Sequence, residues 1–472
     1  MEGFMRRKMI TLFFCMAVFV LIAMLSLPAL NNYMYGCEVT ADYTYNFNTD
    51  PGSLLRVNTK IFRDHFILPQ NTGNWDTGFL KINLKSNLSG RIIEPYVEIE
   101  AQGKSFKQYF VRGAQGIRYL NVSMLSGQKI DKVTLRGHHL TWDMQDGQLL
   151  LFSNQKISGK RILVISPHPD DAELAAFGLY SHRDSFIVTI TDGGASAKKY
   201  DYLFSDAGKE NSHALAAKLR VIDSLTVPYM GDISPVRCIN LGYPDGTLQE
   251  MYKFPSREVR GRYFSRPYVS TARKYNLYPL PALPVEATWP NLVRSLSIIL
   301  DKIQPDIIVA PHPLLDSHPD HHFSSIALFE ALGKCGICKK SALYLYTNHR
   351  ADFYPYGTSD SWVSLPPFFQ NSTFNSIYSY QLSSDESVEK RFAIHAMHDI
   401  GPSPPKADIG FFDLMKTLVF DVGSYIKYNT HLSESYYRRT LRPNELFFVY
   451  AYKDVPALIS EFEKRQKNKR VQ

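Results

Sequence analysis

The stretch Arg161-Ile-Leu-Val-Ile-Ser-Pro-His-Pro-Asp-Asp171 places a short apolar run directly before a cluster of histidine and aspartate residues. Such a run is typical of a strand that is buried on both faces of a parallel sheet. About 150 residues later, Asp306-Ile-Ile-Val-Ala-Pro311 and then His318-Pro-Asp-His321 repeat this arrangement. Ligands of open α/β sheets bind outside the carboxyl ends of the parallel strands. The two clusters are therefore predicted to meet at one site.

From about residue 160 onward, apolar strands alternate with segments of helical length. This alternation predicts an α/β fold whose sheet is mostly parallel, with flanking helices. The segment between residues 346 and 445, rich in Ser, Pro and aromatic residues, is predicted to be dominated by loops. The predicted strands are 162–165, 186–191, 237–241, 306–310, 343–346 and 445–450, and the predicted helices are 172–182, 209–219, 292–302 and 321–332.

Between residues 62 and 152 the pattern changes from helical periodicity to alternating runs such as Phe79-Leu-Lys-Ile-Asn-Leu84. Gly and Asn turn signals separate these runs, which predicts an antiparallel β-sandwich. The sandwich could bind glycans or serve as a structural spacer. We therefore expect three parts: an N-terminal membrane anchor over residues 1–36, a β-sandwich domain over 37–157, and an α/β domain with a C-terminal extension over 158–472.

The N-terminus carries three basic residues, Arg6, Arg7 and Lys8, before an apolar run from Met9 to about Leu30. The length of this run suits a single membrane-spanning helix of ~20 residues. Basic residues on the leading side predict that the N-terminus is inside and that the rest of the chain lies outside the cytoplasm. A cleaved signal peptide is the alternative, because Ser26-Leu-Pro-Ala29 offers small residues for a cleavage site.

The formal net charge is +8, and part of it comes from a basic run at the C-terminal end. No arrangement of basic and aromatic residues is typical of a nucleic-acid-binding module, so no nucleic-acid partner is predicted. Cys335 and Cys338 are the one closely spaced cysteine pair. An oxidising compartment would favour a local disulfide between them, and two free thiols are the alternative.

The motifs Pro167-His-Pro-Asp-Asp-Ala-Glu173, Gly242-Tyr-Pro-Asp-Gly246 and His318-Pro-Asp-His321, in this order, resemble the PIG-L (LmbE-like) zinc-dependent N-deacetylases. The resemblance covers roughly residues 160 to 335. It implies a Rossmann-like, LmbE-type α/β domain with Zn²⁺ as its cofactor. Two imidazoles and one carboxylate with an open position agree with a catalytic zinc site.

The resemblance also implies a role for each residue of the paired motifs. His168, Asp171 and His321 are the expected zinc ligands. Asp170 is the expected general base that takes a proton from the attacking water, as a positioned carboxylate can. His318 is the expected second catalytic residue, stabilising the charged intermediate or protonating the leaving amine.

Four further residues are predicted to contact the substrate. Asp192 and Gly193 follow the second predicted strand, and Asp245 lies in the second family-like motif. The family usually has an arginine on the helix after the second strand, whereas this chain has Lys209 there and no arginine before Arg220. Lys209 is therefore the predicted substitute, or the substrate differs, because lysine does not reproduce the two-pronged contact of arginine.

The expected function is removal of acetyl groups from N-acetylated amino sugars, of the N-acetylglucosamine type, in a glycan or glycoconjugate outside the cytoplasm. One alternative is an amidase that acts on a non-sugar or thiol-conjugate amide. The other is an inactive glycan-binding surface protein. Zinc content separates the last alternative from the two enzymes.

Overall fold

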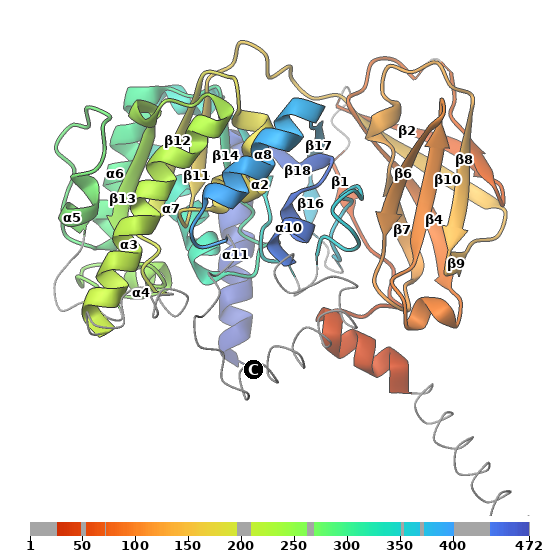
Figure 1. Cartoon of the computed structure of the whole chain (residues 1–472), viewed down its shortest axis with the longest axis horizontal. Helices are drawn as coiled ribbons and strands as arrows, with labels where there is room; N and C mark the ends of the chain where they lie inside the picture. The colour runs from red at the N-terminus through yellow and green to blue at the C-terminus, as the bar shows by residue number, and fades with distance from the viewer. Residues whose placement is uncertain are drawn as a thin grey trace, which may run out of the picture.

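The computed structural model describes residues 26–48, 53–70, 72–195, 209–261, 269–350, 354–368, 372–400 and 435–471. Within these residues the chain builds two large sheets that lie beside each other (Figure 1), together with one two-stranded sheet. One is an antiparallel sheet made by the N-terminal part. The other is a mostly parallel sheet flanked by helices. The predicted α/β class, with a mostly parallel sheet and flanking helices, is confirmed.

The mostly parallel sheet has seven strands in the order β13-β12-β11-β14-β15-β18-β17. The first five strands of this order are parallel; β18 then pairs with β15, and β17 with β18, both in antiparallel fashion. The strands are β11 (Ile162–Ser166), β12 (Ser185–Thr191), β13 (Cys238–Tyr243), β14 (Ile307–Pro311), β15 (Ala342–Tyr346), β17 (Ser376–Gln381) and β18 (Asn444–Ala451).

Helices cover both faces of this sheet. Leu163, Ile165 and Val188 face the layer that contains α6 and α7, whereas Ile162 and Val164 face the layer that contains α2, α3 and α8. Both faces of the strands are thus buried, which explains their continuous apolar runs. The helices are α2 (Asp171–Tyr180), α3 (Lys209–Thr226), α4 (Leu248–Lys253), α5 (Val269–Arg273), α6 (Trp289–Ile303), α7 (Pro319–Lys334), α8 (Ser384–Ala396), α10 (Ser435–Thr440) and α11 (Val455–Val471).

The N-terminal sheet is one continuous antiparallel sheet of nine strands, not the two packed sheets of the predicted sandwich. Its path runs β6-β5-β8-β3-β2-β10-β4-β7, and β9 pairs with β4. The two edges nearly meet, because the Gln108 side chain of β6 donates to the Tyr119 carbonyl of β7 at 2.8 Å. The strands are β2 (Leu54–Ile61), β3 (His65–Ile67), β4 (Thr77–Ser86), β5 (Tyr96–Ala101), β6 (Lys104–Tyr109), β7 (Gln115–Asn121), β8 (Lys132–His138), β9 (Leu140–Thr141) and β10 (Gln145–Phe152).

A segment near the N-terminus joins the two sheets. Strand β1 (Asn46–Phe47) pairs in parallel with β16 (Thr373–Phe374), which lies more than 300 residues later in the chain. Tyr45 packs against rings from both parts, including Tyr119 at 5.6 Å and Phe448 at 6.2 Å between ring centroids. Side chains of the two sheets consequently belong to one continuous apolar core.

Residues 26–35 form a helix whose last residue, Tyr35, is fully buried. Within the described ranges, no helix has both the length and the apolar character needed to cross a membrane. Most of the predicted span, from Met9 onward, lies before residue 26 and so outside the described residues. At the end of α7, a disulfide joins Cys335 to Cys338.

His312 directly follows β14, and its fully buried ring lies beside the rings of Phe374, Phe448 and Tyr450. Its Nε2 lies 3.1 Å from the Tyr450 hydroxyl, and its Nδ1 accepts from the Leu314 backbone N–H at 3.2 Å. These contacts suit the neutral ring, and burial lowers the pKa of His312 to about 3. Protonation in the folded state is therefore strongly disfavoured.

We expect His312 to make the protein labile in acid. Between its unfolded pKa of ~6.5 and its folded pKa, only the unfolded chain binds the proton, so stability falls as pH falls through that window. Lowering the pH from 8 to 5 should cost about 2 kcal/mol through this one group. Urea unfolding of His312→Gln at both pH values should show a correspondingly smaller loss. Tyr450→Phe, which keeps the titrating ring, should retain the wild-type pH dependence; an unchanged dependence in His312→Gln would contradict the prediction.

Candidate metal centre and catalytic site

The sheet order brings the two histidine motifs together. In the sheet, β12 and β13 lie on one side of β11, and β14 lies on its other side. The chain therefore first adds strands on one side of β11 and then crosses to the other. The crevice at such a switch in strand order is the usual ligand site of open α/β sheets. His168 follows β11, and His318 and His321 follow β14, so both motifs lie at this crevice.

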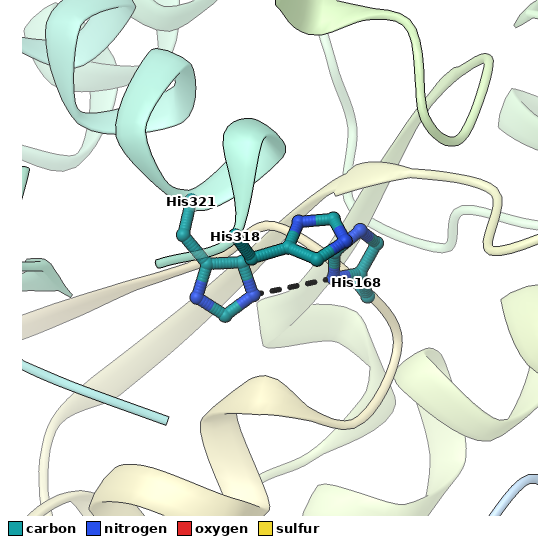
Figure 2. Close-up of side chains that lie close together, drawn as sticks. All are labelled: His168, His318 and His321. Atoms are coloured by element: carbon teal, nitrogen blue, oxygen red, sulfur yellow. Dashed lines mark hydrogen bonds between the residues drawn. The ribbon is translucent and has the colours of Figure 1, made fainter. Parts of the chain in front are cut away.

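Three donor atoms form a small triangle at the centre of the crevice. His168 Nδ1 lies 3.1 Å from Asp171 Oδ2 and 3.3 Å from His321 Nε2, and the latter two atoms are 3.1 Å apart. Figure 2 shows the imidazoles of His168, His318 and His321 close together, with a contact drawn between His168 and His321. All three triangle residues are buried.

This triangle fits zinc. Ligand atoms at about 2.0 to 2.2 Å from a tetrahedral ion lie about 3.3 to 3.6 Å from one another. The three observed separations are close to that range, and two nitrogens with one carboxylate oxygen are a usual catalytic zinc set. Several overlapping groups of these side chains could hold a metal ion, and one of them adds His349 to Asp171 and His321.

Each histidine of the triangle is oriented by carboxylates on its other nitrogen. His321 Nδ1 lies 3.1 Å from Asp316 Oδ2, and His168 Nε2 lies 3.2 Å from Asp245 Oδ1. Burial alone would raise the pKa of the Asp316 carboxyl, but His321 lowers it well below its ordinary value. A carboxylate on the second nitrogen fixes the tautomer of a ligating histidine and raises its basicity.

The carboxylate of the triangle is also held in place. Asn348, which follows β15, donates from its side chain to Asp171 Oδ1 at 2.9 Å. The backbone N–H of Asn348 donates to Asp316 Oδ2 at 2.9 Å. Asn348 therefore holds Asp171 directly and also holds Asp316, the carboxylate that orients His321.

Asp170 lies beside the triangle and contacts Arg220. The Arg220 guanidinium reaches Asp170 Oδ2 at 3.2 Å and the Gly193 carbonyl at 2.7 Å. Burial raises the pKa of Asp170 to about 7, and the Arg220 charge opposes this shift. A buried carboxyl with a pKa near neutrality has the proton affinity that a general base needs.

His318 is half-buried and caps helix α7. Its Nδ1 accepts from the Asp320 backbone N–H at 3.2 Å, and its ring centroid lies 4.8 Å from that of His168. Burial, together with the charges of His168 and His321, lowers the pKa of His318. Because Nδ1 accepts the capping hydrogen bond, the proton of the neutral ring lies on Nε2.

The four residues that were predicted to contact the substrate have different surroundings in the structure. Asp192 is buried, accepts from the Gly194 N–H at 2.9 Å, and burial raises its pKa to about 7. Gly193 has φ +70°, and a Cβ there would lie 2.7 Å from the Arg220 guanidinium. Asp245 supports His168, whereas Lys209 begins helix α3 and its side chain is outside the described part. Contact of these residues with substrate stays a prediction.

Sequence reasoning missed several residues of the site. Asp316 stands five residues before His321, and this spacing to a ligand candidate was an available signal. Arg220 lies eleven residues after Lys209, which stands at the family's motif position, and therefore about three helical turns along the same face of the helix. Asn348 and Asp399, which reaches Arg220 at 3.1 Å, lie beyond the paired motifs and carried no signal.

Removing the Asp316 carboxylate should weaken metal binding. We expect Asp316→Ala to lower zinc affinity by roughly 10- to 100-fold, because His321 would lose the group that fixes its tautomer. Competition with a chromophoric chelator measures this change. Asp306→Ala, at the opposite end of β14, is the matched control, and equal affinities for the two variants would contradict the assigned role of Asp316.

Comparison with known protein families agrees with this geometry. Residues 163–332 match the family model PIG-L, described as GlcNAc-PI de-N-acetylase. The chain carries a PIG-L domain. The match begins within β11 and ends within α7, so it contains every residue of the triangle together with Asp170 and His318. The PIG-L domain is accordingly that of a metal-dependent N-deacetylase, an amidohydrolase.

The chain is also similar to several solved structures, at low sequence identity and low TM-score. The N,N'-diacetylchitobiose deacetylase from Pyrococcus horikoshii is 16% identical, with 62% of this chain and 85% of that chain covered and a TM-score of 0.27. A teicoplanin deacetylase is 16% identical, with 61% and 97% covered and a TM-score of 0.30. A 4-carboxy-2-hydroxymuconate hydratase from Pseudomonas putida is 14% identical, with 62% and 96% covered and a TM-score of 0.30. These scores are too low to support an argument. A search of curated proteins found no match.

Proposed function

We propose that this protein removes acetyl groups from N-acetylated amino sugars, of the N-acetylglucosamine type, in a glycan or glycoconjugate outside the cytoplasm. The observation that carries the proposal is the combination of the donor triangle with Asp170, a carboxylate beside the triangle that has its own partner in Arg220. The description of the PIG-L family, which names the de-N-acetylation of GlcNAc-PI, supports the choice of an N-acetyl sugar.

The residues divide the work of amide hydrolysis. His168, Asp171 and His321 would hold zinc, which when bound supplies a Lewis acid for the amide carbonyl and the attacking water. Asp170 takes a proton from that water as its oxygen bonds to the acyl carbon. The carbon–nitrogen bond then breaks, Asp170 passes the proton that it took from the water to the amine nitrogen, and the free amine and acetate are the products. His318 stabilises the negative charge that develops on the carbonyl oxygen.

The proposed location depends on the N-terminal sequence. An apolar run after three basic residues favours export or anchoring with the bulk of the chain outside. The disulfide between Cys335 and Cys338 supports an oxidising compartment, where disulfides persist.

The test is acetate release by the full chain, purified in detergent and loaded with zinc. We expect release from N-acetylglucosamine oligomers and from envelope glycans, and none after the metal is removed by a chelator. A panel of non-sugar and thiol-conjugate amides runs beside them. Hydrolysis confined to that panel would replace the sugar substrate by another amide, and a chain that binds no zinc would overturn the enzyme proposal.

A further inference from the structure

A second feature of the crevice is a cavity of about 390 Å³ on the side of His349. Ser317, His349, Arg350 and Arg439 contribute to its lining, together with the turn at Gly36 and Cys37. Apart from Ser317, these residues lie outside the stretch that matches the PIG-L family. The cavity is therefore a property of this chain's own N-terminal and C-terminal segments.

The cavity adjoins the metal centre. The His349 ring centroid lies 4.7 Å from that of His321 and 5.3 Å from that of His318. Ser317, whose backbone N–H donates to the His349 carbonyl at 2.7 Å, also lines the cavity and directly precedes His318 in the chain. A group bound in the cavity thus lies one side chain away from the residues that would hold zinc and the reacting amide.

The guanidinium groups of Arg350 and Arg439 line this cavity, and both are held by uncharged backbone carbonyls. Arg350 donates to the Pro367 carbonyl at 2.6 Å, and Arg439 donates to the Asn348 carbonyl at 2.8 Å. Among the residues that the structure describes, no carboxylate forms a salt bridge with either arginine. Backbone carbonyls orient the guanidinium groups without neutralising them, so both positive charges remain available to a ligand.

Arginine pairs of this kind favour an oxyanion. A guanidinium presents parallel N–H donors that match the paired oxygens of a phosphate or carboxylate, and such charge-assisted bonds are stronger than those to neutral hydroxyls. Two like charges beside one cavity also repel each other, and an anion between them relieves that repulsion. A neutral sugar ring would leave this charge uncompensated.

We propose that this cavity, the Arg350–Arg439 pocket, binds an anionic group of the substrate, a phosphate or carboxylate attached close to the N-acetyl sugar. This inference rests on the proposed deacetylase function and narrows its substrate to acidic saccharides or glycoconjugates. The anion belongs either to a soluble saccharide or to a lipid-linked one. We include a lipid-linked saccharide because the turn at Gly36 and Cys37, which lines the cavity, follows the N-terminal helical segment.

The first test measures binding of inorganic phosphate to the zinc-loaded full chain by isothermal titration. We expect Arg350→Gln and Arg439→Gln each to weaken binding by tenfold or more, with zinc content unchanged. Arg136→Gln, at an exposed arginine of β8 in the N-terminal sheet, is the matched control and should bind as the wild type does. Arg350→Lys and Arg439→Lys, which keep the charge, replace the glutamine variants if those do not fold and should bind at least several-fold more weakly than wild type.

Two results would contradict the proposal that the Arg350–Arg439 pocket binds an anion. One is phosphate binding that is equal in the wild type and in the double variant, since the anion would then sit elsewhere. The other is a wild type that binds no phosphate at millimolar concentration. Both results stand whether or not the protein hydrolyses any amide.

The second test compares acetate release from N-acetylglucosamine 1-phosphate and from methyl N-acetylglucosaminide. The double glutamine variant should lose tenfold or more in kcat/KM for the phosphorylated sugar and keep its value for the neutral one. Equal losses for the two sugars would contradict an anion subsite. If the wild type hydrolyses neither sugar, the proposed function fails, and the phosphate titration alone decides the pocket.

A competition experiment distinguishes the two sources of the anion. Mixed micelles containing phosphatidylglycerol, with phosphatidylcholine micelles as the control, compete against bound phosphate. Displacement by phosphatidylglycerol assigns the pocket to a lipid-linked substrate. Displacement by N-acetylglucosamine 1-phosphate alone assigns it to a soluble one, and displacement by neither would contradict an anion pocket that serves substrate.

Discussion

Replacing Asp170 by asparagine should lower kcat for acetate release by roughly 100- to 10,000-fold while zinc stays bound. Asparagine has the shape of aspartate and keeps an oxygen for Arg220, which lies 3.2 Å from Asp170 Oδ2. It cannot take a proton from the attacking water. Acetate release and zinc content are measured on the same preparation, so that loss of catalysis is separated from loss of metal.

Asp399→Asn is the matched control for this experiment. Asp399 contacts the same guanidinium at 3.1 Å but comes from the segment after α8. Its replacement makes the same chemical change on the other side of Arg220, and we expect a much smaller loss of kcat. Loss of zinc in Asp170→Asn would make Asp170 a ligand, which the grouping of His168, Asp170 and Asp171 allows in principle. Near-normal activity in that variant would remove Asp170 from the role of base.

The sheet around the site was predictable because its strands are buried on both faces. Continuous apolar runs marked β11, β12 and β14 to within a residue or two at either end. The positions of His168 and His321 followed from the rule that ligands collect at the carboxyl ends of such strands. Composition and local pattern sufficed here because each motif stands next to its own strand.

Contacts between distant residues were not predictable from local pattern. Asn348 reaches Asp171 across 177 positions of the chain, and Arg220 reaches Asp170 across 50. Such pairs depend on how helices and loops pack, which periodicity does not encode. The same holds for the N-terminal sheet, because alternation predicted its strands but not that its edges β6 and β7 would nearly meet.

The segment after residue 346 contains a sequence signal for the start of a helix. Ser383 and Glu386 form a capping box at the start of α8, with the Ser383 side chain accepting from the Glu386 N–H at 3.1 Å. The spacing of serine and glutamate is a known sign of a helix start. Strand β17 precedes it directly, so the predicted loop-dominated region contains a strand and a helix of the α/β fold.

The largest effect on stability should come from a buried ion pair that these late elements supply. Lys390 of α8 donates to Glu445 of β18 at 2.7 Å, and both side chains are only 2% exposed. Glu445 in turn accepts from the backbone N–H groups of Gly178 and Leu179, where α2 is interrupted at Ala176. The ion pair thus satisfies the backbone of the helix that begins with Asp171.

We expect Lys390→Met to destabilise the fold by about 3–5 kcal/mol, because the Glu445 charge would stay buried without its cation. The urea midpoint of unfolding measures this loss. Lys160→Met is the matched control, since Lys160 pairs with Asp306 at 3.6 Å on the surface and is 40% exposed. Exposed pairs of that kind contribute about 0–1 kcal/mol.

A double variant separates the charge from the packing. Lys390→Met with Glu445→Gln removes both charges, and the glutamine oxygen can still accept from the Gly178 N–H. Because an uncompensated charge is the main cost of the single change, the double variant should recover most of the lost stability. If the double variant is as unstable as Lys390→Met, the lysine acts through its contact with the Leu174 carbonyl at 3.2 Å and not through Glu445. If Lys390→Met costs no more than Lys160→Met, the pair does not hold α2, and the position of Asp171 depends on Asn348 and the histidines alone.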